Sequence, residues 1–170
     1  KVRNYSELSE LGTAALPRFT ALMRGIVNEA GLDPDADAMH DGKPLACTAE
    51  ANFKVLTIAP LKAHARCDEK VANEYDGEYD RIVDCVRCSI VVETEEQLLK
   101  VASHLSTSGA DPAVLTDGGA HSSAAGTLRF VLVRLKNRYK TPLFNGYRDG
   151  LYSVAIEVQP GVWCVCEVQL

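Results

Sequence analysis

Apolar and polar positions recur along the chain with two different periods, and these periods predict where helices and strands lie. From Pro17 to Ala30 the apolar side chains follow helical spacing, which predicts a helix that ends at Gly31. Residues 1–16 are mixed and are expected to be poorly ordered or only partly helical. From Tyr152 to Val158 the period is two, which predicts a strand, and a Pro-Gly turn leads into a second strand from Trp163 to Leu170.

Four further elements are expected in the middle of the chain. They are a helix from Leu61 to about Tyr75, a strand from Ile82 to Glu93, a helix from Glu95 to Leu105, and a strand from Leu128 to Leu135. Thr94 suits the N-cap of the second of these helices, and Gln97 stands in the capping-box position. Strand, helix and strand thus follow one another in a βαβ-like order.

Two turn-rich segments separate these elements. The acidic stretch from Gly31 to Pro44 is expected to be a solvated linker, because Pro34 interrupts it and no Glu closes a calcium-binding loop. The stretch from Ser106 to Gly126 is rich in small residues and is expected to be a flexible loop. We therefore expect a helical section with a linker over residues 1–59 and a second domain over residues 60–170.

Composition narrows the class of protein. The chain has 170 residues, of which 46% are hydrophobic and 24% charged, and its formal net charge is −5. No apolar run reaches the length of a membrane span, and the net negative charge argues against a general nucleic-acid binder. There is no initiating Met or signal-peptide pattern at Lys1, and Leu170 directly follows a strand-like run, which indicates a fragment or a processed chain.

The six cysteines allow two interpretations. Cys85 and Cys88, with Cys164 and Cys166, could supply four thiolates to zinc. The favoured interpretation is that they are buried as small hydrophobic residues, because Cys164 and Cys166 share a strand face with Val168. Nothing in their spacing indicates a secreted disulfide framework, so we expect an intracellular, reducing compartment, either the cytoplasm or an organelle.

The densest cationic stretch of the chain begins at the end of the strand expected at residues 128–135. It contains Arg134, Lys136, Arg138 and Lys140, and after Pro142 and an Asn145-Gly146 turn it continues with Tyr147 and Arg148. Cations beside an aromatic ring suit a nucleotide, because charge binds phosphate and the ring stacks on a base. Asn-Gly is also a common turn of ordinary hairpins, but a hairpin does not require the preceding cations.

The spacing R-x-K-x5-P-x2-N-G-Y, which begins at Arg134 and ends at Tyr147, resembles the synthetase signature of the RelA/SpoT family of (p)ppGpp enzymes. The resemblance extends over roughly residues 60–170. It implies an α+β fold, with a mixed β-sheet flanked by helices as in nucleotidyltransferases. It also implies that Tyr147 stacks on the guanine of the acceptor nucleotide. The other residues implied in nucleotide binding here are Arg134, Lys136, Arg138, Asn145 and Arg148.

A second cationic pattern lies in the helix expected from Leu61. Lys62, Arg66 and Lys70 are spaced at i, i+4 and i+8, so they share one helical stripe. This is similar to the family's K-x3-S-x3-K helix, which binds the phosphates of the donor ATP, although Arg66 replaces the Ser and Pro60 stands where an Arg is usual. The alternative is a solvated helix face without a ligand.

The metal-binding motifs of the family are matched in part. Arg87 fits the D-x4-R segment, but Ile82 occupies the place of the Asp, with Asp80 two residues before it and Asp84 two after. We expect Asp84 to serve if the entry to the strand differs, for example by a bulge. The last strand carries Glu167 in an E-x-Q motif, on the face opposite the cysteines.

The resemblance implies an ATP-dependent, Mg²⁺-dependent pyrophosphokinase. In the family, pyrophosphate passes from ATP to the 3′-hydroxyl of GDP or GTP, and the metal is held by carboxylates, here Asp84 and Glu167, which are also the expected catalytic residues. An adenine nucleotide or an RNA 3′ end are alternative acceptors. A different class of function also stays open: a catalytically degenerate domain that serves as a nucleotide-binding or structural subunit of a larger assembly or of a homo-oligomer.

Overall fold

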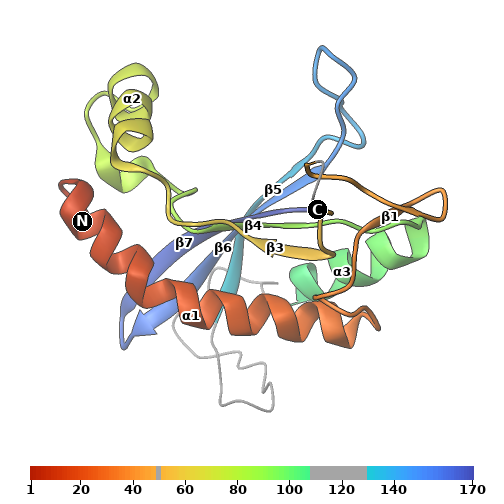
Figure 1. Cartoon of the computed structure of the whole chain (residues 1–170). Helices are drawn as coiled ribbons and strands as arrows, with labels where there is room; N and C mark the ends of the chain where they lie inside the picture. The colour runs from red at the N-terminus through yellow and green to blue at the C-terminus, as the bar shows by residue number, and fades with distance from the viewer. Residues whose placement is uncertain (49–50, 108–129) are drawn as a thin grey trace.

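A five-stranded mixed sheet organises the fold (Figure 1). The computed structural model describes residues 1–48, 51–107 and 130–170. In the order in which they lie side by side, the strands are β3 (Leu56–Ile58), β4 (Arg87–Ile90), β7 (Val162–Gln169), β6 (Gly150–Gln159) and β5 (Phe130–Asn137). β4 and β7 are parallel, and the other neighbours are antiparallel. The last strand of the chain therefore lies at the centre of the sheet.

Helix α1 (Tyr5–Glu29) is longer than the sequence pattern predicts. It begins twelve residues before the expected start, with the Asn4 side chain accepting a hydrogen bond of 3.0 Å from the backbone N–H of Glu7. The expectation that residues 1–16 are poorly ordered or only partly helical is wrong, and Pro17 lies inside the helix. The predicted end at Gly31 is confirmed: its φ is +80°, and the N–H of Leu32 bonds back to Val27 at 3.1 Å.

The main core lies between the sheet and two helices, α1 and α3 (Glu95–Thr107), which lie on the same side of it in Figure 1. The core-facing side chains that are almost fully buried include Phe19, Met23, Val101, Leu105, Val154, Ile156, Cys166 and Val168. Burial of each large apolar side chain contributes about 1.5–3 kcal/mol. The strand faces expected around the cysteines are confirmed, because Cys164, Cys166 and Val168 are all buried here.

The start of α3 confirms the predicted capping box. Thr94 Oγ1 accepts from the N–H of Gln97 at 3.2 Å, and Gln97 Oε1 accepts from the N–H groups of Glu93 and Thr94 at 2.9 and 3.2 Å. The helix runs on to Thr107. The rest of the loop expected at residues 106–126, and the start of the strand expected at residue 128, lie outside the described residues.

A second, smaller core explains two differences from the predicted elements. It joins α1 to α2 (His64–Glu74) and to the 3₁₀ turn η1 (Tyr79–Arg81) through Leu8, Cys67, Val71, Ile82 and Cys85. Because Ile82 and Cys85 pack there, the strand expected from Ile82 is confined to β4. The helix expected from Leu61 begins three residues later, since the backbone N–H of Lys62 bonds to the carbonyl of Cys85 at 3.1 Å.

The acidic segment expected to be a linker contains a small hairpin. Strands β1 (Met39–His40) and β2 (Lys43–Pro44) pair across Asp41 and Gly42, which both have positive φ angles, of 50° and 72°. Strand β3 follows and was not predicted. Both β3 and α1 contribute to the main core together with the C-terminal strands, while the expected division at residue 60 stays a prediction. Within the described residues, no helix is both long and apolar enough to cross a membrane.

Candidate functional site

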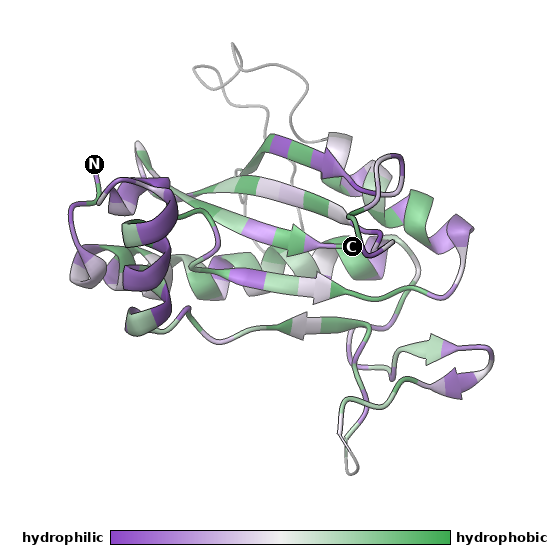
Figure 2. Ribbon diagram, turned by 90° about the horizontal axis from the view of Figure 1, so that it is seen from above, coloured by the Kyte–Doolittle hydropathy of each residue, from purple (hydrophilic) through white to green (hydrophobic). Residues whose placement is uncertain are grey.

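The face of the sheet opposite α1 and α3 carries a row of polar side chains. Strand pairing aligns Arg87 on β4 with Glu167 on β7, Glu167 with Ser153 on β6, and Ser153 with Arg134 on β5. Directly paired residues point to the same face, so these four side chains form one line across the sheet. A second line places Gln169 beside Ser89 on one side and Leu151 on the other, followed by Lys136. Figure 2 shows the alternation of hydrophilic and hydrophobic positions along the strands.

At one end of this face two lysines converge on a buried carboxylate. Asp84 lies just before β4, and its Oδ2 accepts hydrogen bonds from Lys62 Nζ at 2.5 Å and from Lys70 Nζ at 2.9 Å. The Asp84 side chain is only 11% exposed. Its other oxygen, Oδ1, is buried and has no hydrogen-bond partner among the described residues. Lys62 and Lys70 thus meet at Asp84 although only Lys70 lies in α2.

The pKa of Asp84 reflects opposing influences. Burial, the largest of them, raises this pKa, but the hydrogen bonds and charges of Lys62 and Lys70 outweigh burial and leave the pKa below its usual value. Burial lowers the pKa of Lys70, and the bond to Asp84 more than reverses this, so the pKa is raised. Both groups are therefore charged at neutral pH.

Glu167 belongs to the same electrostatic group. Its backbone N–H bonds to the carbonyl of Val86 at 2.9 Å, which fixes β7 beside the entry to β4. Burial raises the pKa of the Glu167 carboxyl, and the negative charge of Asp84 raises it further, while Lys70, Lys62 and Arg87 lower it. The carboxylates predicted as a pair are thus brought close enough to influence each other, through the parallel pairing of β4 with β7.

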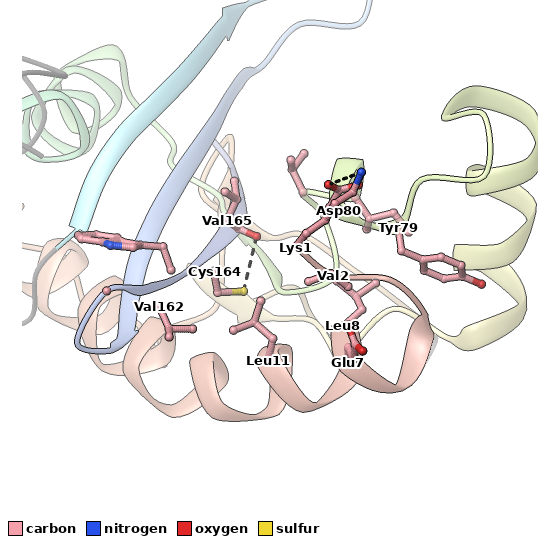
Figure 3. Close-up of a pocket in the computed structure, with 14 residues that line it drawn as sticks. Lys1, Val2, Glu7, Leu8, Leu11, Tyr79, Asp80, Val162, Cys164 and Val165 are labelled. Atoms are coloured by element: carbon pink, nitrogen blue, oxygen red, sulfur yellow. Dashed lines mark hydrogen bonds and ion pairs between the residues drawn. The ribbon is translucent and has the colours of Figure 1, made fainter.

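The other predicted residues of this end lie farther out. Arg66 is largely exposed and pairs with Glu69 at 2.5 Å, next to Lys62 and Lys70 on the wall of an open pocket of about 270 Å³. Asp80, the alternative to Asp84, lies in η1 and pairs with Lys1 at 3.6 Å. It lines a separate pocket of about 510 Å³ between η1, the start of α1 and the β6–β7 turn (Figure 3). None of the residues predicted to bind nucleotide, and neither Asp84 nor Glu167, is among those that line this second pocket.

At the other end of the face, the loop between β5 and β6 holds Tyr147. The backbone N–H of Gly146 bonds to the carbonyl of Leu143 at 2.8 Å, and the φ of Gly146 is +81°. The Asn145 side chain accepts from the N–H of Tyr147 at 3.1 Å, so Asn145 shapes the turn. Tyr147 is 45% exposed, so its ring is accessible from solvent.

A buried carboxylate that sequence reasoning missed organises this end. Asp149 is 3% exposed, and both its oxygens accept hydrogen bonds from the Arg138 guanidinium, with 2.7 Å from Nη2 to Oδ2. Gln169 Nε2 donates to the same Oδ2 at 2.8 Å and also to the Tyr147 hydroxyl at 2.6 Å. The bond to Asp149 raises the pKa of Arg138.

Three of the predicted cations lie near this loop. Arg134 and Lys136 lie on exposed positions of β5, and Arg148 is exposed in the loop. Within residues 1–48, 51–107 and 130–170 none of the three forms an ion pair, so each is available to a ligand phosphate. Arg87, by contrast, contacts the carbonyl of Asp84 at 3.3 Å, near the other end of the face.

A metal ion would find two carboxylates here. No cluster of three or more His, Cys, Asp or Glu side chains suited to a metal occurs in the part of the chain that the structure describes. Mg²⁺ commonly takes only one or two protein carboxylates, and the rest of its ligands are water and phosphate oxygens. Asp84, whose Oδ1 has no partner among the described residues, and Glu167 are the two carboxylates expected to supply such ligands.

Comparison with known proteins identifies the fold. No protein-family model and no curated protein sequence matches the chain. Solved structures with the same fold include a GTP pyrophosphokinase family protein from Streptococcus pneumoniae (TM-score 0.60, 13% identity, 96% of this chain and 67% of that one). Another is small alarmone synthetase 2 from Bacillus subtilis (TM-score 0.57, 14% identity, 97% and 71%).

A third similar structure is the complex between the type VI effector Tas1 and its immunity protein (TM-score 0.55, 19% identity, 97% of this chain). The present chain spans 59% of the matched chain in that structure. The expected α+β fold, a mixed sheet flanked by helices of the RelA/SpoT synthetase type, is therefore confirmed, and the resemblance found in the sequence holds at the level of the fold.

Proposed function

We propose that this protein transfers the pyrophosphoryl group of ATP to the 3′-hydroxyl of a guanine nucleotide or of an RNA end. The observation that carries the proposal is the position of Glu167 between two groups of polar and charged side chains that are proposed to bind the ligands. On one side lie Asp84 and its two lysines, and on the other Gln169 connects β7 to Tyr147. The fold, shared with proteins described as a GTP pyrophosphokinase and an alarmone synthetase, supports the proposal.

On the donor side, Lys62 and Lys70 are proposed to bind the phosphates of ATP, with Arg66 and Arg87 near them. Both lysines now bond to one oxygen of Asp84. A triphosphate carries more negative charge than one carboxylate, so it would draw the lysines away from Asp84. The carboxylate would then have both oxygens available for Mg²⁺, which when bound offsets the charge that develops on the transferring phosphates.

On the acceptor side, Tyr147 is proposed to stack on the purine base, while Arg134, Lys136 and Arg148 bind the acceptor's phosphates. Base stacking on an exposed ring is worth about 1–3 kcal/mol. Glu167, whose pKa is raised by burial, is proposed to accept the proton of the attacking 3′-hydroxyl. Pyrophosphoryl transfer of this kind is mainly positioning and charge stabilisation, which these side chains supply.

The test is to incubate the protein and Mg²⁺ with ATP labelled in its terminal phosphate, and with GDP, GTP, an adenine nucleotide or a deacylated tRNA in turn. We expect a labelled 3′-pyrophosphorylated product with at least one guanine nucleotide or RNA acceptor, and none with Glu167→Gln. Nucleotide binding that is equally tight with and without Mg²⁺, with no product from any acceptor, would instead identify a nucleotide-binding subunit of a larger assembly.

A further inference from the structure

We infer that Asp149 is a positioning residue that holds Tyr147 at a fixed place relative to Glu167, and that Arg138 supports the Tyr147 ring instead of binding phosphate. The inference rests on the proposed function, because it assigns a purpose to the placement of the ring that would bind the acceptor base.

The first step is that the Asp149 carboxylate is fully used inside the protein. Arg138 Nε donates to Oδ1, and Arg138 Nη2 and Gln169 Nε2 donate to Oδ2 at 2.7 and 2.8 Å. The backbone N–H of Arg138 also bonds to the Asp149 carbonyl at 2.9 Å. A paired guanidinium and carboxylate of this kind are held in one geometry, so Arg138 has little freedom to turn toward a ligand.

The second step is that both groups held by Asp149 contact Tyr147. Gln169 Nε2 donates to the Tyr147 hydroxyl at 2.6 Å, and the guanidinium carbon of Arg138 lies 5.9 Å from the centre of the ring. A cation at this distance from an aromatic face is attracted to it. The edge and one face of the ring are therefore fixed through Asp149, while 45% of the side chain stays exposed for a base.

The third step connects the ring to the proposed proton acceptor. Gln169 lies two residues after Glu167 on β7, on the same face of the sheet. Two residues of a strand span roughly 7 Å, and a central strand holds this separation rigidly. An acceptor whose base stacks on Tyr147 and whose 3′-hydroxyl meets Glu167 must match a fixed spacing, which Asp149 maintains.

The experiment is a double-mutant cycle measured by calorimetry with GDP as the probe, in the absence of ATP. Asp149→Asn removes the charge that fixes Arg138 and is expected to weaken GDP binding about tenfold, the size of a coupling within a hydrogen-bonded network. In the Tyr147→Ala background the same change is expected to have no further effect, because Asp149 acts through the ring. Binding of a non-hydrolysable ATP analogue should be unchanged by Asp149→Asn.

Asp35→Asn is the matched control. Asp35 accepts hydrogen bonds from Nη1 and Nη2 of Arg24, which is exposed on α1, so this substitution should leave GDP binding intact. If Asp149→Asn does not fold, as judged by circular dichroism, Gln169→Leu decides the matter: it keeps the pair of Arg138 and Asp149, removes the bond to Tyr147 and should weaken GDP binding severalfold.

The outcomes separate the inference from the function it rests on. If the Asp149→Asn variant binds GDP as tightly as the wild-type protein, the inference alone is overturned. The inference alone is also overturned if Asp149→Asn weakens GDP binding by the same factor in the Tyr147→Ala background as in the wild type. Wild-type protein that binds neither GDP nor any other purine nucleotide would overturn both the inference and the proposed function.

Discussion

Asp84 and Asp149 are the two buried carboxylates of the described chain, and they are bonded in different ways. Asp149 uses both oxygens, accepting from Arg138 and Gln169. Asp84 accepts two lysines on one oxygen and leaves the other buried without a partner in the described part of the chain. A buried polar atom without a hydrogen bond costs about 1–3 kcal/mol, so such an atom indicates a function that compensates for the cost.

The difference separates a structural carboxylate from one that is available to a ligand. A satisfied carboxylate orders the side chains around it, as Asp149 orders Tyr147 and Arg138. An unsatisfied carboxylate beside cations that a phosphate also attracts is suited to exchange those cations for a metal ion. The end of the polar face at Asp149 is thus held rigidly, and it is where the base is proposed to bind. The end at Asp84 has partners that a ligand could replace, and it is where the phosphates are proposed to bind.

The largest expected effect concerns the exchangeable end. Asp84→Asn and Glu167→Gln should each lower turnover by about 10³-fold, because each removes a charge that the transfer step needs, while GDP binding through Tyr147 stays nearly unchanged. Steady-state assays of pyrophosphoryl transfer measure the turnover, and calorimetry measures the affinity for GDP. Turnover that survives either substitution would remove the distinction drawn above between Asp84 and Asp149.

At the rigid end the next effect is on stability. Asp149→Ala should lower the free energy of unfolding by about 3 kcal/mol, since it leaves the partly buried Arg138 without its partner. Urea unfolding at neutral pH measures the change. The matched substitution Asp35→Ala breaks an exposed pair with Arg24 and should lower the free energy of unfolding much less, because solvent screens the pair. Equal losses for both variants would contradict an organising role for Asp149.

The third effect tests the ring that Asp149 holds. Tyr147→Ala should weaken binding of a guanine nucleotide by about 1–3 kcal/mol through loss of stacking, with the fold intact. Calorimetry measures the affinity, and circular dichroism checks the fold. Phe144 on the same loop is fully exposed, so Phe144→Ala is the control for a general effect of the loop's aromatic side chains. An unchanged affinity in Tyr147→Ala would count against the base platform.

The smallest effect compares Asp84 with its neighbour Glu167 through the pH dependence of stability. The folded pKa of Asp84 lies below the ordinary value of 3.8, so its ionisation stabilises the protein above that pH, and this stability is lost as the pH falls through the folded pKa. Asp84→Asn should therefore destabilise the protein at neutral pH, by an amount that disappears in acid.

Glu167 should behave in the opposite way. Its folded pKa lies above the ordinary value of 4.5, so stability falls as the pH rises from 4.5 through the folded pKa. Glu167→Gln should stabilise the protein at neutral pH, and the gain should vanish below pH 4.5. Unfolding midpoints in urea from acid to neutral pH measure both variants, and shifts of the same sign would show that the two carboxylates do not differ in environment.

Local signals in the sequence account for the parts of the fold that were predicted well. The capping box at Thr94, the helix end at Gly31 and the alternation from Cys164 to Val168 each depend on a few neighbouring residues. The start of α1 was missed because Pro17 is typical of a first helical turn, whereas the first half of the helix is stabilised by distant contacts. There, Gly12 approaches Leu61 and Cys85 so closely that an added Cβ would lie 3.2 and 3.3 Å from them.

The candidate site shows the same limit. The motifs predicted which residue types belong to the site. Asp84 was preferred over Asp80 because it lies nearer in sequence to the strand that contains Arg87. The lysine partners of Asp84 depend on the packing of α2 against the residues that precede β4. The bond of Asp149 to Gln169 depends on the register of β6 with β7, which no local pattern specifies. The proposed assignment of Arg138 to the Tyr147 ring follows from one of these long-range bonds, whereas the local pattern shows Arg138 only as one cation among several.

The central position of β7 in the sheet has a consequence for how the protein folds. Strand β4 ends at Ile90 and cannot complete its pairing until residues beyond Val162 have been synthesised, because its parallel neighbour is the last strand of the chain. Contacts between residues so far apart in sequence form late and slow the search for the native state. The same strand brings Glu167 to Arg87 and Gln169 to Tyr147, so both halves of the proposed site and the core depend on this strand. A nascent or truncated chain without β7 would lack the core and the site together, and partial activity from an incomplete chain is not expected.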